Sequence, residues 1–198
     1  MSPTGTTTGP VDPTPPGQGG GPEPAPELRP KVWIVGENNP YQADPVQAQR
    51  YALYFDPPQS AGGRLCRAIL GMDEREYLRA FERRNLLCQP KWSVPAARAS
   101  ARALALELPY GPESAVVLLG RKVFEAFDWY SARVINRDWN GQWEPFRTLW
   151  YQATHYALLP HPSGRCRKWN AEAVKRARAA VLEVAPHLKG KLGVREGA

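Results

Sequence analysis

Short apolar runs alternate with helix-like periodicities from Lys31 onward, and they predict four strands separated by helices. The runs are rich in Val, Ile and Leu, and glycine, proline or asparagine bounds them. They cover residues 31–36, 85–88, 115–120 and 156–159. Because strands that are apolar throughout are buried on both faces, the pattern predicts an α/β fold: a three-layer α/β/α sandwich on a four-stranded, mainly parallel sheet.

Capping residues mark where the intervening helices begin. Ser60 precedes an apolar stripe that stops at Gly71, and Asp73 opens a capping box for a helix over 74–81. Ser93 opens a helix to residue 108, and another helix covers 121–127. The last helix follows Asn170, and its predicted apolar face consists of Val174, Ala177, Val181, Val184 and Leu188.

The first 30 residues differ in composition from the rest of the chain. They hold 9 of the 21 prolines and 6 of the 17 glycines, without an apolar run. Such a segment cannot bury enough surface to fold, so we expect a disordered tail over 1–30 and not a signal peptide. The folded domain should span 31–188, followed by a flexible C-terminal tail over 189–198.

The charge of the predicted domain favours a polyanionic partner. The chain carries a net charge of +7, and the first 30 residues contain three acids and one arginine, which leaves +9 on the rest. A domain this basic suits nucleic acid or an anionic membrane surface. No segment is long and apolar enough to span a bilayer, which favours nucleic acid over a membrane.

The cysteines and histidines lack the spacing of a metal site. Cys66, Cys88 and Cys166 are far apart and form no C-x-x-C pair, so neither a disulfide framework nor a zinc or iron–sulfur site is indicated. We therefore expect no metal, no cofactor and a reducing cytoplasmic location, in association with the nucleoid.

A histidine between two prolines ends the last predicted strand. Pro160 and Pro162 restrict the backbone around His161, so its side chain is held in a pre-set direction. A basic tip follows, with Arg165, Arg167, Lys168 and Trp169. This arrangement suits a polyanion presented to the imidazole, and the alternative is a proline-rich turn with solvated charges.

The carboxyl ends of parallel strands meet at one edge of a sheet, where ligands bind. Here those ends are residues 36–41, 88–92, 120–122 and 161–164. Lys91, Arg121 and Lys122 should join the basic tip in one positive rim, which predicts DNA binding that weakens steeply with salt. Alternatively, these charges point to different faces and only keep the domain soluble.

The ordered motifs resemble those of the uracil-DNA glycosylase superfamily. Gly36 is followed by Asn39-Pro40 after the first strand, and His161-Pro162-Ser163-Gly164 follows the last. Residues 61–65, 85–90 and 117–124 are similar to intermediate segments of that superfamily, so the resemblance covers about 31–188. It implies a superfamily-like fold and a monomeric, monofunctional enzyme that removes uracil, or a related deaminated base, from single- or double-stranded DNA in base-excision repair.

The resemblance also implies catalytic roles. His161 would donate a hydrogen bond to the carbonyl oxygen of the departing base, and Asn39 would hold the attacking water. Three residues separate Gly36 from Pro40 where the familiar motifs have two, so Asn38 could take the same slot, and Glu37 could act as the base if the loop is re-aimed.

Further residues would hold the substrate. By resemblance, Asn85 reads the edge of the base, Gly36 belongs to the substrate-binding residues, and Tyr41 crowds the 5-position to exclude thymine. Phe55, with Tyr54 as its rival, stacks on the flipped base. The resemblance implies DNA contacts by Ser163, which would hold a phosphate, by Arg165, in the place of an intercalating residue, and by Arg167, Lys168 and Lys91.

Other interpretations remain open at this point. The protein could be a catalytically weak relative that only binds DNA or damaged bases. The asparagines before Pro40 could form an ordinary turn, Asn85 could cap a strand and Phe55 could be plain core. A nucleotide-binding Rossmann-like enzyme lacks support, because no glycine-rich turn follows the first strand. Hypoxanthine and mismatched thymine are alternative substrates.

Overall fold

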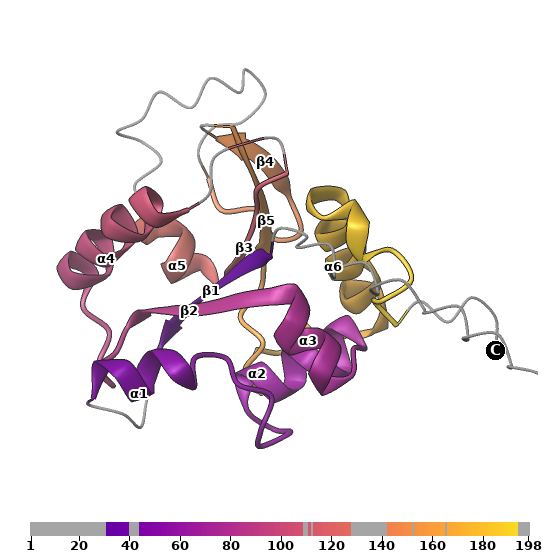
Figure 1. Cartoon of the computed structure of the whole chain (residues 1–198), viewed down its shortest axis with the longest axis horizontal. Coiled ribbons are helices and arrows are strands. Elements are labelled where there is room, and N and C mark those ends of the chain that lie inside the picture. Colours follow the sequence, from indigo (N-terminus) through magenta and orange to yellow (C-terminus); the bar gives the residue numbers. More distant parts are fainter. Residues whose placement is uncertain are drawn as a thin grey trace, which may run out of the picture.

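One sheet organises the protein in the computed structural model, which describes residues 31–39, 44–108, 111, 113–127, 142–151, 153–164 and 166–193. Within these ranges the sheet has five strands in the order β2-β1-β3-β5-β4 (Figure 1). The strands are β1 Val32–Asn38, β2 Phe81–Leu87, β3 Ala115–Leu119, β4 Thr148–Tyr151 and β5 Thr154–Leu159. The predicted α/β class is confirmed.

The prediction of four strands was wrong, because it missed the edge strand β4. β1 pairs in parallel with β2 and β3, and β3 pairs in parallel with β5, but β4 lies antiparallel to β5. The sheet is therefore mixed and mostly parallel. β4 is only four residues long and Trp150 within it is half exposed, so it lacks the continuous apolar run that marked the other strands.

Two strands extend further than their apolar runs suggest. β1 continues through Gly36 to Asn38, because Gly36 pairs with Asn85 of β2 and does not end the strand. β2 begins at Phe81, immediately after helix α3, Glu74–Ala80. The first half of β2 contains polar residues, so it has no apolar run that would predict a strand. The predicted helix over 74–81 is one residue too long, because Phe81 belongs to β2.

The helices begin where the capping residues predicted. α2, Ala61–Gly63, continues into the π-helix η1, Arg64–Leu70, and Gly71 ends it in the left-handed conformation. The side chains of Ser60, Asp73 and Asn170 accept hydrogen bonds from backbone N–H groups in the first turns of their helices. The remaining helices are α1 Pro45–Arg50, α4 Val94–Glu107, α5 Arg121–Ala126, α6 Ala171–Val184 and the 3-10 turn η2 Pro186–Leu188. α1 and η2 were not predicted.

Two hydrophobic cores cover the two faces of the sheet. Ile34, Val117 and Leu159 pack with η1, α3 and α6, whereas Val35 and Leu118 pack with α4 and α5. Figure 1 shows α4 and α5 on one side of the sheet and α3 and α6 on the other. The buried face of α6 is Ala173, Ala177, Ala180, Val181 and Val184, so the predicted Val174 is only half-buried.

The packed domain extends past the predicted end at residue 188. Leu192 is buried, and the backbone N–H of Gly193 donates to the carbonyl oxygen of Leu70. The guanidinium of Arg178 in α6 donates to the carbonyls of Ile69 and Gly193, at 2.7 Å each. Residues 189–193 therefore belong to the domain, and 194–198 lie outside the described residues, as does the predicted tail over 1–30. In the described ranges no helix is long and apolar enough to cross a membrane.

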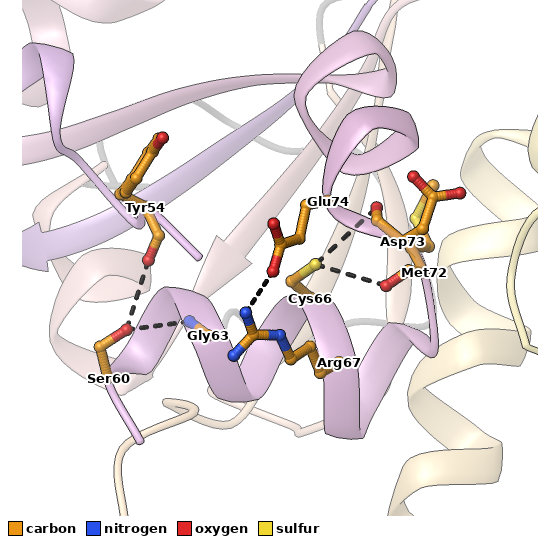
Figure 2. Close-up of polar contacts among 8 residues, drawn as sticks. All are labelled: Tyr54, Ser60, Gly63, Cys66, Arg67, Met72, Asp73 and Glu74. Carbon is orange, nitrogen blue, oxygen red and sulfur yellow. Dashed lines mark hydrogen bonds and ion pairs between the residues drawn. The ribbon is translucent and has the colours of Figure 1, made fainter. Parts of the chain in front are cut away.

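The Ser60 cap gives the first prediction. Its Oγ accepts from the Gly63 N–H at 2.9 Å and donates to the Tyr54 carbonyl at 3.3 Å (Figure 2). We expect Ser60→Ala to lower the free energy of unfolding by about 1 kcal/mol, measured by urea denaturation. Ser93→Ala is the matched control, because Ser93 precedes α4 without a side-chain capping bond to any described residue. An equal loss in both variants would contradict the prediction.

Candidate active site

The sheet order brings the carboxyl ends of four parallel strands together. Asn85 near the end of β2 lies beside Gly36 in β1, and β3 and β5 follow on the other side. Gly120 directly follows β3, and His161 follows β5 by two residues. The structure therefore brings Glu37, Asn85 and His161, predicted from separate motifs, to one edge.

Two side chains from outside the histidine segment anchor its backbone. The indole Nε1 of Trp169 donates to the carbonyl oxygen of His161 at 2.9 Å, and Nε of Arg64 in η1 donates to the carbonyl oxygen of Pro162 at 2.9 Å. Pro160 and Pro162 are buried. The carbonyl groups of His161 and Pro162 are thus both held by hydrogen bonds. The direction of the His161 side chain is therefore fixed by η1, by the segment before α6 and by the two prolines.

The imidazole of His161 has a defined donor. Its Nδ1 accepts a hydrogen bond from the backbone N–H of Ser163 at 3.2 Å, so the neutral ring carries its proton on Nε2. Burial lowers the pKa of His161 below its ordinary value of 6.5, the Glu37 carboxylate opposes this shift, and the Lys122 ammonium adds to it. The geometry favours a neutral imidazole with an Nε2–H donor at neutral pH.

Glu37 lies beside this histidine. A Cβ built on Gly120 would sit 3.1 Å from Oε1 of Glu37 and 3.3 Å from Cβ of His161, so Gly120 packs closely against both residues. Its φ of +98° also favours glycine. Nζ of Lys122 in α5 lies 3.3 Å from Oε2 of Glu37. A carboxylate, an ammonium and an imidazole therefore share one corner of the site.

The two asparagines that follow Glu37 have different surroundings. Nδ2 of Asn38 donates to the carbonyl oxygens of Gln89, at 3.3 Å, and Pro90, at 2.7 Å, and so ties the loop after β2 to β1. Asn39 is buried, and its backbone N–H donates to the Leu87 carbonyl at 3.2 Å. The amide of Asn38 thus holds the loop after β2, whereas the carboxylate of Glu37 faces Gly120 and Lys122.

The side chain of Asn85 packs against Gly36 of the neighbouring strand β1. It is 8 % exposed, and a Cβ on Gly36 would come within 2.4 Å of its Oδ1. The absence of a side chain at Gly36 therefore gives the Asn85 amide its place over β1. The same imaginary Cβ would lie 3.2 Å from Cδ2 of Leu53, so the segment leading to Tyr54 and Phe55 borders this position.

The rings of Tyr54 and Phe55 are both half-buried, with centroids 4.3 Å apart. Tyr54 also contacts the ring of Tyr51 edge-on and lies under the guanidinium of Arg83, whereas Phe55 lies near that of Arg67. Arg67 in turn pairs with Glu74, as Figure 2 shows. Stacking of either ring on a base stays a prediction.

Part of the predicted basic rim is assembled. Lys122 lies 5.6 Å from the ring centroid of Trp92, which places the loop containing Lys91 next to α5. Arg121 pairs with Glu125. Arg167 and Lys168 are exposed in the turn before Trp169. Tyr41 and Arg165, together with Pro40, lie outside the described residues.

The sequence did not reveal two residues that support the site. Arg64 holds the carbonyl of Pro162, and Gln49 in α1 bonds to the backbone of Asn85. Their partners lie 98 and 36 residues away, so local spacing carries no signal for either contact. In the described part of the chain, no group of three or more His, Cys, Asp or Glu side chains is placed to hold a metal ion.

Comparison with known proteins adds no relative. Neither a scan of the sequence against protein-family models nor a search among curated proteins finds a match. Functional inference therefore depends on the residues at the strand ends and on their geometry.

Proposed function

We propose that this protein is a monofunctional DNA glycosylase with a uracil-DNA glycosylase-like fold, which hydrolyses the N-glycosidic bond of uracil or a related deaminated base. The observation that carries the proposal is the neutral, anchored His161, whose Nε2–H donor stands at the same strand edge as Glu37 and Asn85. Base removal needs a donor for the leaving base, a group that holds water and a group that reads the base.

The proposed reaction begins with a base flipped out of the DNA. The bond between the base nitrogen and C1′ of the sugar breaks, and its electron pair stays on the base. Negative charge then develops on the carbonyl oxygen of the base, which accepts a hydrogen bond from Nε2–H of His161. A neutral donor suffices for this task, in agreement with the lowered pKa of His161.

Water then attacks C1′ of the oxocarbenium-like sugar, which leaves an abasic site. Among the three candidates, we assign the water to Glu37, because a carboxylate can accept the proton of water and an amide cannot. The Asn38 amide already holds the loop at Gln89 and Pro90. Lys122 holds the Glu37 carboxylate in place beside His161.

Recognition of the base is assigned to Asn85. Its side-chain amide offers one donor and one acceptor side, which complements the edge of uracil and mismatches that of cytosine. Phe55 or Tyr54 supplies a stacking surface, and Ser163, Arg167, Lys168 and Lys91 supply contacts to DNA phosphates.

A labelled oligonucleotide that contains one uracil tests this function directly. Incubation with the protein followed by hot alkali should break the strand at the uracil, since an abasic site is labile to alkali. If no break forms at any protein concentration while the oligonucleotide is still bound, the protein is a binding module and the proposed enzyme class is wrong.

The pH dependence of excision should reflect His161. Protonation of Nδ1 would oppose the N–H of Ser163, so kcat/KM should stay level above pH 7 and decline only below the ordinary histidine pKa of 6.5. Lys122→Met should move this decline to higher pH, because the ammonium lowers the pKa of His161 while Glu37 raises it. Arg121→Met is the control, since Arg121 pairs with Glu125. Identical profiles for wild type and Lys122→Met would refute the coupling.

Binding to DNA should depend on salt through the basic turn. Reversing two of its charges, with Arg167→Glu and Lys168→Glu, should weaken binding and reduce the slope of log Kd against log salt by about 2. Fluorescence anisotropy with a uracil-free oligonucleotide measures both quantities. The same reversal at two exposed arginines in helices α3 and α4, Arg75 and Arg98, should change the slope less. Equal changes in the two double variants would show that the turn has no special part in binding.

A further inference from the structure

Helix α1 lies against the outer edge of the sheet next to the proposed base-reading residue. β2 is an edge strand among the described residues, so one side of its backbone has no strand as a neighbour. At Asn85 the side chain of Gln49 lies where the backbone of a neighbouring strand would otherwise be. Its Oε1 accepts from the Asn85 N–H at 3.3 Å, and its Nε2 donates to the Asn85 carbonyl at 3.0 Å. One side chain thus makes both hydrogen bonds that a neighbouring strand would make.

This arrangement needs a primary amide. Among side chains, only Asn and Gln offer a carbonyl acceptor and an NH₂ donor in one planar group. α1 has a further tie to the same strand end, because Sγ of Cys88 contacts the carbonyl of Pro45 at 3.9 Å and Nε2 of Gln49 at 3.7 Å. Asp44 caps the start of the helix at Val46. Gln49 is half-buried and is held on a short, anchored helix.

The backbone of Asn85 sets where its amide points. On the inner side, Asn85 pairs with Gly36, and its Oδ1 occupies space that a Cβ at position 36 would need. On the outer side, Gln49 prevents the peptide groups from turning. Small displacements of a group that reads a base cost much of its discrimination.

We infer that Gln49 is a positioning residue, which fixes the backbone of Asn85 so that its amide faces the flipped base. The inference rests on the proposed glycosylase function. Gln49 acts through Asn85 and does not itself touch the base. Its contribution should therefore vanish when the Asn85 side chain is absent.

The test is a double-mutant cycle with Gln49→Ala, Asn85→Ala and the combined variant, assayed by single-turnover excision of uracil with enzyme in excess. In the wild-type background, Gln49→Ala should reduce the rate about 10- to 30-fold. In the Asn85→Ala background, the same change should cost less than about 2-fold. Gln49→Glu should not restore the rate, because a carboxylate cannot donate to the Asn85 carbonyl. Gln47→Ala on the same helix is the control and should leave excision unchanged.

Hydrogen exchange of the backbone N–H of Asn85 gives a readout that is independent of catalysis. Gln49→Ala should accelerate this exchange, whereas Gln47→Ala should not. Equal losses of rate in both backgrounds, or unchanged exchange at Asn85, would overturn the inference while the enzyme class stands. A wild-type protein that binds DNA but releases no uracil would instead overturn the proposed function, and the inference with it.

Discussion

His161→Ala should slow uracil release by about 10²- to 10³-fold while the protein still binds DNA. The imidazole is the proposed donor to the negative charge that develops on the base, and loss of one such donor typically costs that much. Affinity depends mainly on contacts between cationic side chains and phosphates, so it should change little. Single-turnover excision and fluorescence anisotropy on the same oligonucleotide separate the two effects.

The control for this variant is His187→Gln, because η2 follows the opposite end of α6 from the anchored turn. It should leave excision within about 3-fold of wild type, as expected for a change outside the site. A His161→Ala protein that excises uracil at the wild-type rate would remove the central residue of the proposed mechanism.

Gly36→Ala should be as damaging as removal of the Asn85 side chain. The added Cβ would lie 2.4 Å from Oδ1 of Asn85, a distance that real atoms do not tolerate, so the amide must leave its place. We expect kcat/KM for uracil to fall about 100-fold or more in Gly36→Ala and in Asn85→Ala, since buried polar groups of the base lose their partners in both variants.

Gly164→Ala is the matched control for the glycine substitution. Among the described residues a Cβ there would meet only Nη1 of Arg64, at an ordinary contact distance of 3.8 Å, and Gly164 is exposed. Excision should stay within a few-fold of wild type. If Gly36→Ala retained full activity in a folded protein, Asn85 would not read the base from its present position.

The sequence was sufficient to predict most of the scaffold, because its signals are local. Apolar runs marked the four parallel strands, and Ser60, Asp73 and Asn170 marked three helix starts that the structure confirms. β4 escaped prediction because its four residues gain their structure from pairing with β5. α1 escaped because its six residues are too few to show a helical periodicity and because it is held by contacts to the distant β2.

The candidate site could be predicted only in part. Motif order and the geometry of parallel sheets were enough to expect His161, Asn85 and Gly36 at one edge. The sequence could not distinguish Glu37 from Asn38, since the difference lies in tertiary contacts: Asn38 bonds to the loop at Pro90, and Glu37 faces Gly120 and Lys122. Gln49 has no local signature at all.

The two anchors of the histidine backbone affect how distant relatives should be classified. Arg64 and Trp169 hold the carbonyls of Pro162 and His161, yet neither belongs to the His-Pro-Ser-Gly signature. A related protein with substitutions at these two positions would keep the His-Pro-Ser-Gly sequence, but its imidazole would lose its fixed direction. Under the proposed function, a classification by the His-Pro-Ser-Gly sequence alone would therefore misplace some of these relatives, and the arginine and the tryptophan should be considered together with it.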